Sequence, residues 1–184
     1  MRTLLLRSLF ARPVTIEAPT PEQAALAELG AALEKRARKL FGRSITIREV
    51  DAGSCNGCEL EIHALNNAVY DVERFGIKFA ASPRHADVLL VTGPVSHNMK
   101  VGLERTYAAT PDPKWVVAVG DCACGCGMFA DSYATVGAVE KVVPVDLHIK
   151  GCPPRPIDLL KGLIALMDKA TESQRSSAEP SPRM

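Results

Sequence analysis

The sequence predicts an α/β fold, in which a mostly parallel sheet has helices on both faces and follows an N-terminal helix. Two observations lead to this prediction. Short apolar runs alternate along the chain with longer segments of helical periodicity, which is the order typical of parallel sheets. The runs over 88–92 and 114–119 are apolar almost throughout, as expected of strands covered on both faces.

The composition is that of an ordinary globular protein. Of the 184 residues, 47% are hydrophobic and 23% are charged, which is sufficient for one domain with a sizeable core. Lys and Arg number 22 against 21 Asp and Glu, so the charge gives no support for a nucleic-acid partner. No run approaches the about 18 consecutive apolar residues of a transmembrane helix. We therefore expect a single α/β domain, with its leading helix, over 20–170.

Two terminal segments are expected to lie outside this domain. Residues 1–19 form an N-terminal extension, whose apolar side chains are spaced for one face of a short helix. Such a helix could dock on a membrane surface or on a partner, and a frayed terminus is the alternative. Residues 171–184 are rich in Ser, Pro, Glu and Arg, a composition that predicts a disordered tail.

The first expected element is a helix that begins at Thr20 and ends at Gly42. Thr20 is a suitable cap, Pro21 suits the first helical position, and Gly42 is typical of the residue that follows a helix. This helix precedes the α/β core and need not be part of it. A strand over 45–50 follows, and then a helix over 59–73.

The remaining elements alternate in the same way. In order, they are strands over 77–80 and 88–92, a polar loop over 93–99, a helix over 100–109, strands over 114–119 and 143–149, and a helix that begins at Pro156. In a parallel sheet of this kind, ligands bind beyond the carboxyl ends of the strands.

Three cysteine loops directly follow predicted strands. They contain Cys55 with Cys58, Cys122, and Cys152. Because the carboxyl ends of parallel strands meet at one edge of the sheet, these four thiols should converge there. Four thiolates, a Cys-x-x-Cys pair, a Cys-Pro pair and nearby glycines are typical of an iron–sulfur cluster. A zinc site, a redox dithiol and buried unpaired cysteines are the alternatives.

A set of sequence motifs resembles one superfamily, over about residues 43–168. It contains the small subunit of NiFe hydrogenases and the 20 kDa subunit of NADH–quinone oxidoreductase, respiratory complex I. The motifs are Gly53-Ser54-Cys55-x-x-Cys58-Glu59-x-Glu61, Glu73-Arg74-Phe75-Gly76, Ser82-Pro83-Arg84-His85-Ala86-Asp87-Val88, Pro144-Val145-Asp146 and Gly151-Cys152-Pro153-Pro154-Arg155-Pro156.

The resemblance implies a flavodoxin-like fold that carries one 4Fe–4S cluster. Its ligands would be Cys55, Cys58, Cys122 and Cys152. The complex I subunits have adjacent cysteines in the first motif, whereas this chain has the spaced pair of the hydrogenases. The chain is therefore most similar to the small subunit of membrane-bound, energy-converting NiFe hydrogenases of the formate hydrogenlyase and hydrogenase-4 type.

Such a subunit relays electrons and has no complete active site of its own. The resemblance implies three kinds of partner: a hydrogenase-like large subunit, a ferredoxin-like iron–sulfur subunit and integral membrane subunits. These would hold the chain peripherally on the cytoplasmic side of the cell membrane. The alternatives are the 20 kDa subunit of an NADH–quinone oxidoreductase-like complex, which passes electrons to quinone, and a zinc-stabilised adaptor. FMN is not expected, because the glycine-rich loops carry cysteines where phosphate-binding residues would stand.

The third loop departs from the family, which usually has a single cysteine there. Here Cys122-Ala123-Cys124-Gly125-Cys126 offers three, and the motif aligns Cys122 as the ligand. We interpret Cys124 and Cys126 as spare thiols. A substitute ligand for Cys122 and a redox-sensitive pair are the alternatives. This crowding argues against the disulfide framework of a secreted protein and favours metal-bound thiolates in a reducing compartment.

Charged residues near the cysteines could have either of two roles. Glu61 matches a glutamate that lies near the cluster in the complex I branch, so proton transfer or tuning of the cluster potential is one hypothesis. A helix-terminus charge is the other, because acids are favoured on the first turn of a helix. Glu59 is expected to be a solvated charge of that second kind. Arg155 and His148 flank the last cysteine and could donate hydrogen bonds to cluster sulfur.

Overall fold

The computed structural model describes residues 20–129 and 131–178. Its centre is a five-stranded sheet in the order β2-β1-β3-β5-β7, with every neighbouring pair parallel. The strands are β1 (Ile45–Asp51), β2 (Ile77–Phe79), β3 (Val88–Thr92), β5 (Trp115–Val119) and β7 (Leu147–Ile149). This order confirms the predicted flavodoxin-like α/β fold. The N-terminal extension lies outside the described residues, so docking by it stays a prediction.

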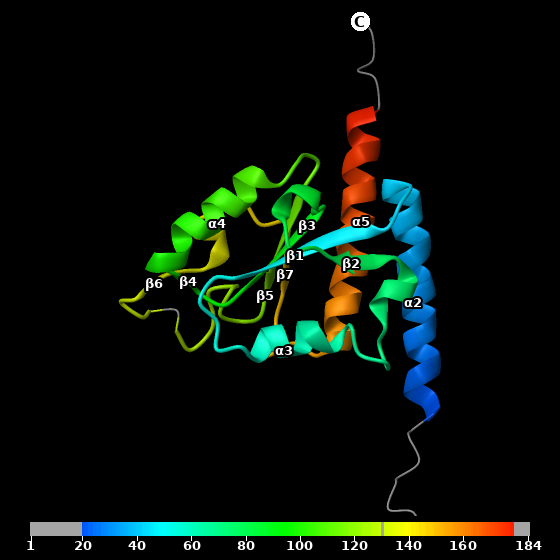
Figure 1. The fold of residues 1–184 in the computed structure, drawn as a ribbon, viewed down its shortest axis with the longest axis horizontal. Helices are drawn as coiled ribbons and strands as arrows, with labels where there is room; N and C mark the ends of the chain where they lie inside the picture. The colour runs from blue at the N-terminus through cyan, green and yellow to red at the C-terminus, as the bar shows by residue number, and fades with distance from the viewer. Residues whose placement is uncertain (1–19, 130, 179–184) are drawn as a thin grey trace, which may run out of the picture.

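Helices cover both faces of the sheet (Figure 1). They are α2 (Thr20–Phe41), α3 (Gly57–Ala64) and α5 (Pro156–Ala178) on one face, and α4 (His97–Ala109) on the other. Successive residues of β3 alternate between the two cores, because side chains of a strand point to opposite faces. Val88 and Leu90 pack under α2, α3 and α5, whereas Leu89 and Val91 pack under α4.

The leading helix α2 is an integral part of the first core, although the sequence left this open. Leu26, Leu33 and Ala37 are buried in that core. The helix runs beside α5 (Figure 1), and an ion pair of 2.7 Å joins Arg36 Nε to Asp168 Oδ1. A pattern of leucines shows that a helix has an apolar face, but it does not say which layer that face packs against.

The helix predicted over 59–73 is much shorter. Helix α3 ends at Ala64, and a single 3-10 turn over Val72–Phe75 precedes β2. The side chain of Asn67 explains the break, because its Oδ1 accepts hydrogen bonds from the backbone N–H groups of Val69 and Tyr70 at 2.9 and 3.0 Å. Asparagine often competes with the helical backbone in this way.

The region before α4 also differs from the prediction. Helix α4 begins at His97, not at residue 100, because Ser96 Oγ caps it by accepting from Met99 N at 3.2 Å. Two short strands that the sequence did not predict, β4 (Val95–Ser96) and β6 (Thr135–Gly137), pair antiparallel beside it. The strand predicted over 143–149 is limited to β7.

The last helix is longer than predicted. Helix α5 continues to Ala178, so residues 171–178 are helical where the sequence predicted disorder. Leu163, Leu166 and Met167 anchor the preceding turns in the first core. Once a helix is anchored, each added residue contributes a hydrogen bond at little further entropic cost, even where the side chains are polar. Residues 179–184 lie outside the described part of the chain.

Candidate functional site

The predicted cysteine loops meet at the carboxyl edge of the sheet. Cys55 lies in the loop after β1, and Cys58 lies on the first turn of α3. Cys122 follows β5, and Cys152 follows β7. Four thiols from three separate segments therefore share one end of the fold.

The converging thiols lie close enough to affect the pKa of Cys58. Burial raises the pKa of Cys58 to about 12, and Glu59 and the thiols of Cys55, Cys122 and Cys152 contribute to the increase. Burial likewise raises the pKa of Cys122, with added contributions from Cys152 and Cys55. Four thiols that lie close enough to act on one another are a donor set that suits a metal-containing group, and a coordinating metal would deprotonate them.

Cys124 and Cys126 form a separate pair. Burial raises the pKa of Cys124 to about 11, and the next contribution comes from Cys126. The Cys124 thiol points to the carbonyl of Ala118, with 3.9 Å between Sγ and O, and Cys126 Sγ lies 3.5 Å from the carbonyl oxygen of Asp121. The raised pKa of Cys122, by contrast, includes contributions from Cys152 and Cys55, the cysteines of the other two loops. This grouping supports Cys122 as the fourth member of the site.

The arrangement of the thiols bears on which metal group they fit. Within residues 20–129 and 131–178, no three His, Cys, Asp or Glu side chains are arranged to hold one metal ion. A zinc ion needs its ligands within about 2.0–2.3 Å of a single point. A 4Fe–4S cluster takes one thiolate on each of its irons, so its ligands stand further apart. Both groups take thiolate ligands, and the metal content of the purified protein separates them.

The first cysteine loop is shaped by Asp51 at the end of β1. Asp51 Oδ1 accepts hydrogen bonds from the backbone N–H groups of Gly53 and Ser54, both at 2.8 Å. Ser54 Oγ in turn accepts from Asn56 N at 3.0 Å, and Asn56 adopts a left-handed φ of 69°. These bonds turn the chain back before α3 begins at Gly57. Asp51 belongs to none of the motifs noted in the sequence, although an Asp whose side chain bonds the backbone two residues on is a common turn-former, and Gly53 nearby was a signal for such a turn.

Gly120 brings the third loop close to Cys58. It has a φ of +91°, and a Cβ there would collide with Cys58 Sγ. Gly57 lies between the first and last loops, where a Cβ would make ordinary contacts of 3.6 Å to Cys55 Sγ and 3.9 Å to Pro153 Cβ. The absence of a side chain at Gly120 therefore lets the third loop approach the first.

Replacing Gly120 by Ala is expected to destabilise the protein more than replacing Gly42 by Ala. Both glycines have positive φ, +91° and +65°, but a Cβ at Gly42 would meet no atom within 4 Å. Gly42→Ala should therefore cost only the about 1–2 kcal/mol of a left-handed L-residue. Gly120→Ala should add about 1–3 kcal/mol for overpacking against Cys58. Urea unfolding of both variants measures the difference, and equal losses would contradict the close contact.

Glu59 is not the solvated charge that the sequence predicted. It is only 6% exposed, and neither of its carboxylate oxygens has a hydrogen-bond partner among the described residues. Burial also raises the pKa of the neighbouring Glu49 on β1, and Glu59 adds to that increase. Glu59 lies three residues before the buried Ile62, so helical periodicity was the signal that could have placed it on the inner face.

The other charged candidates have carboxylate neighbours. Arg155 Nε lies 2.9 Å from Asp158 Oδ2, and His148 Nε2 lies 3.7 Å from Glu140 Oε2. Glu61 is the fifth residue of α3, beyond the first turn on which the sequence placed it, and is partly exposed. The contacts of Arg155 and His148 with carboxylates give no support to hydrogen bonds with cluster sulfur. The first turn of α3 carries Glu59 instead, so the helix-terminus role of Glu61 is weak and its proton-transfer role stays a prediction.

An apolar surface adjoins Cys55. A cavity of about 310 Å³ lies between the first cysteine loop and the segment that contains Phe129 and Thr135. In the same segment, Met128 and Tyr133 are 91% and 97% exposed. Large apolar side chains gathered at one edge are typical of a surface that another protein covers.

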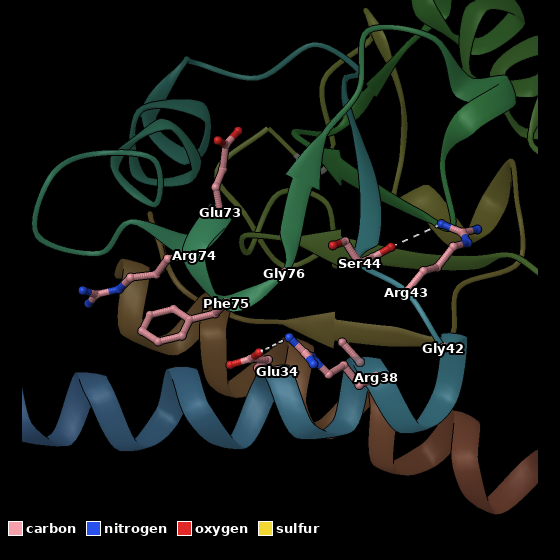
Figure 2. Close-up of a pocket in the computed structure, with 10 residues that line it drawn as sticks. Glu34, Arg38, Gly42, Arg43, Ser44, Glu73, Arg74, Phe75 and Gly76 are labelled. Carbon is pink, nitrogen blue, oxygen red and sulfur yellow. Dashed lines mark hydrogen bonds and ion pairs between the residues drawn. The ribbon is translucent and has the colours of Figure 1, made fainter.

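A second cavity, of about 400 Å³, lies at the opposite end of the sheet, where β1 and β2 begin (Figure 2). Its arginines have carboxylate neighbours. Arg38 lies 2.8 Å from Glu34, Arg43 forms two hydrogen bonds to Asp87, and Arg74 is 3.9 Å from Asp71. This pairing leaves little positive charge to attract an anion, and the cavity is remote from the cysteines.

The chain is similar to known oxidoreductase subunits. It is 43% identical over 151 residues to the probable membrane-bound hydrogenase subunit mbhJ of Pyrococcus furiosus, covering 80% of this chain and 90% of that one. It is also 43% identical over 147 residues to formate hydrogenlyase subunit 7 of Escherichia coli, but spans only 56% of that protein. An NADH-quinone oxidoreductase subunit of Citrifermentans bemidjiense is 45% identical over 119 residues, covering 65% of this chain and 69% of that one.

The comparison with solved structures agrees with these similarities. A chain of the membrane-bound sulfane sulfur reductase, an archaeal respiratory membrane complex, matches with a TM-score of 0.64 and 37% identity, over 78% of this chain and 77% of that one. Among the described residues, no helix is both long and apolar enough to cross a membrane. The family model for the NADH ubiquinone oxidoreductase 20 kDa subunit matches residues 55–166, which include all four converging cysteines. This chain therefore belongs to the family of the NADH ubiquinone oxidoreductase 20 kDa subunit, whose members are subunits of oxidoreductases.

Proposed function

We propose that this chain is the electron-transfer subunit of a membrane-bound NiFe hydrogenase of the formate hydrogenlyase type. It would carry one 4Fe–4S cluster on Cys55, Cys58, Cys122 and Cys152. The observation that carries the proposal is the convergence of these thiols from three loops, with three of them raising the pKa of Cys58. The similarity to a hydrogenase subunit over 80% of this chain supports the choice of complex.

When bound, the cluster supplies one-electron transfer, and the chain fixes its position and surroundings. Cys58 is partly buried, whereas Cys55 and Cys152 are exposed at the edge of the fold. The apolar Met128 and Tyr133 are exposed as well, so this edge is where the large catalytic subunit would dock. A ferredoxin-like subunit would exchange electrons with the chain, and integral membrane subunits would hold it on the cytoplasmic side.

The proposal is tested by anaerobic purification of the chain co-expressed with its large subunit. About five iron atoms per complex are expected, four from the cluster and one from the NiFe centre of the large subunit, together with an EPR signal after reduction by dithionite. The large subunit should co-purify and should cover the surface around Met128 and Tyr133. Stoichiometric zinc with a silent EPR spectrum would overturn the proposal and favour a zinc-stabilised adaptor.

Transfer of electrons to quinone is the second candidate function. It is favoured by the 45% identity to an NADH-quinone oxidoreductase subunit, and by the cavity beside Cys55. The spacing of Cys55 and Cys58 favours the hydrogenase instead. Assays of hydrogen evolution and of quinone reduction on the same purified complex separate the two, as does the nickel content of the large subunit.

A further inference from the structure

We propose that Asp121 is a positioning residue, which holds the loop of Cys122 and the loop of Cys152 at the spacing that a shared metal cluster needs. This inference rests on the proposed function, because it requires a cluster on these thiols. None of the sequence motifs assigns a role to Asp121.

Asp121 binds Gly151 through both its backbone and its side chain. Its backbone N–H donates to the carbonyl of Gly151 at 2.9 Å, and its Oδ1 accepts from the backbone N–H of Gly151 at 2.8 Å. Asp121 directly precedes Cys122, and Gly151 directly precedes Cys152. One residue pair, 30 positions apart, therefore links the chain neighbours of two predicted ligands.

The Asp121 carboxylate binds Gly151 beyond the last paired residues of β5 and β7. The register of β5 and β7 ends at the pair Val119 and Ile149, and one further bond joins Gly120 N to the carbonyl of Ile149 at 2.8 Å. Beyond that point, Asp121 Oδ1 takes the place of a backbone acceptor for Gly151. A hydrogen bond to a carboxylate is roughly twice as strong as one between neutral groups, so it suits the point at which the pairing of β5 and β7 ends.

The backbone at Gly151 has a conformation and a close contact that only glycine accommodates. Its φ is +141°, and a Cβ on it would lie 2.6 Å from the backbone of Pro154. Asp121 also anchors the far end of its own loop, because its carbonyl accepts from Cys126 N at 3.0 Å. The residue thus fixes the Cys122 loop on both sides while it holds the Cys152 loop.

The chain contains a matched control at the opposite end of the same two strands. Asp146 N donates to the carbonyl of Val116 at 2.9 Å, and Asp146 Oδ2 accepts from Val116 N at 2.8 Å. The bonding pattern and the separation of 30 residues are the same as for Asp121 and Gly151. Both aspartates are partly buried, but Asp146 lies at the end of the sheet away from the cysteine loops.

The test compares D121A and D146A in the complex with the large subunit, prepared without oxygen. Three quantities are measured: the urea midpoint of unfolding, iron per chain, and the rate of iron loss to a chelator. Similar shifts of the urea midpoint are expected for both variants. D121A should lose iron about 10–100-fold faster than the parent, the range seen when supporting residues of metal ligands are removed. D146A should lose it at the parent rate.

Two further variants make the result specific. D121N keeps an oxygen acceptor at Oδ1, so it should restore most of the parent's resistance to the chelator. D121E keeps the charge but lengthens the side chain by one methylene, so it should lose iron faster even if D121A does not accumulate. Equal iron loss from D121A and D146A, or parent-like loss from D121E, would overturn the positioning role while leaving the proposed function intact. A parent complex without iron would instead overturn the proposed function.

Discussion

Cys58→Ser is expected to remove the cluster, so that the complex loses about four iron atoms and keeps only the iron of the NiFe centre. All three of the other converging cysteines contribute to the raised pKa of Cys58, so this substitution removes a thiol that lies close to each of them. Because metal binding is coupled to folding, the variant should also accumulate poorly or unfold more easily. Iron analysis and EPR of the reduced, anaerobically purified complex measure the effect. Cys55→Ser and Cys152→Ser should behave in the same way.

Cys124→Ser and Cys126→Ser are the matched controls for this experiment. Their thiols lie in the same loop as Cys122, but after burial the largest contribution to the raised pKa of Cys124 comes from Cys126. Their iron content should therefore stay close to that of the parent. If Cys126→Ser lost the iron of the cluster and Cys122→Ser kept it, the ligand in this loop would be Cys126 and not Cys122.

Glu61→Gln is expected to reduce turnover of the complex by about 10²–10⁴-fold if Glu61 transfers protons, the range typical of losing a positioned proton-transfer group. Glutamine keeps the size and hydrogen-bonding capacity of the side chain but cannot be titrated. No proposed ligand is changed, so the iron content should stay at the parent value. Hydrogen evolution and iron content are measured on the same purified sample.

The alternative role of Glu61 predicts a different result. A charge one turn into α3 contributes no more than the about 0.3–1 kcal/mol of a helix-terminus charge, and its loss would leave turnover unchanged. Glu104→Gln is a suitable control, because Glu104 is an exposed glutamate on α4, on the other face of the sheet. Near-normal turnover of Glu61→Gln with full iron would remove the proton-transfer hypothesis.

Many features of the fold could be predicted from local patterns. Val88–Thr92 and Trp115–Val119 are apolar almost throughout, and such runs are readily identified as buried strands. The ends of elements were less predictable. Asn67 ends a helical pattern early, and Ser96 starts α4 early, because single side-chain hydrogen bonds outweigh a weak propensity.

The convergence of the cysteine loops was also predictable, because it follows from topology. A parallel sheet places the carboxyl ends of its strands at one edge, so any loop that follows a strand lies there. The sequence could not distinguish Cys122 from Cys124 and Cys126 by spacing alone. The family motif was required to choose Cys122. In the structure, Cys152 and Cys55 contribute to the raised pKa of Cys122, which agrees with that choice.

The sequence by itself determined the α/β class of this protein, its family and the loops that carry its cysteines, because these depend on short patterns along the chain. Only the tertiary structure decided that α2 belongs to the core, that Glu59 is buried near Glu49, and that Asp121 binds Gly151. Each of these depends on contacts between segments that are distant along the chain. Such contacts form when elements pack, so no local pattern specifies them.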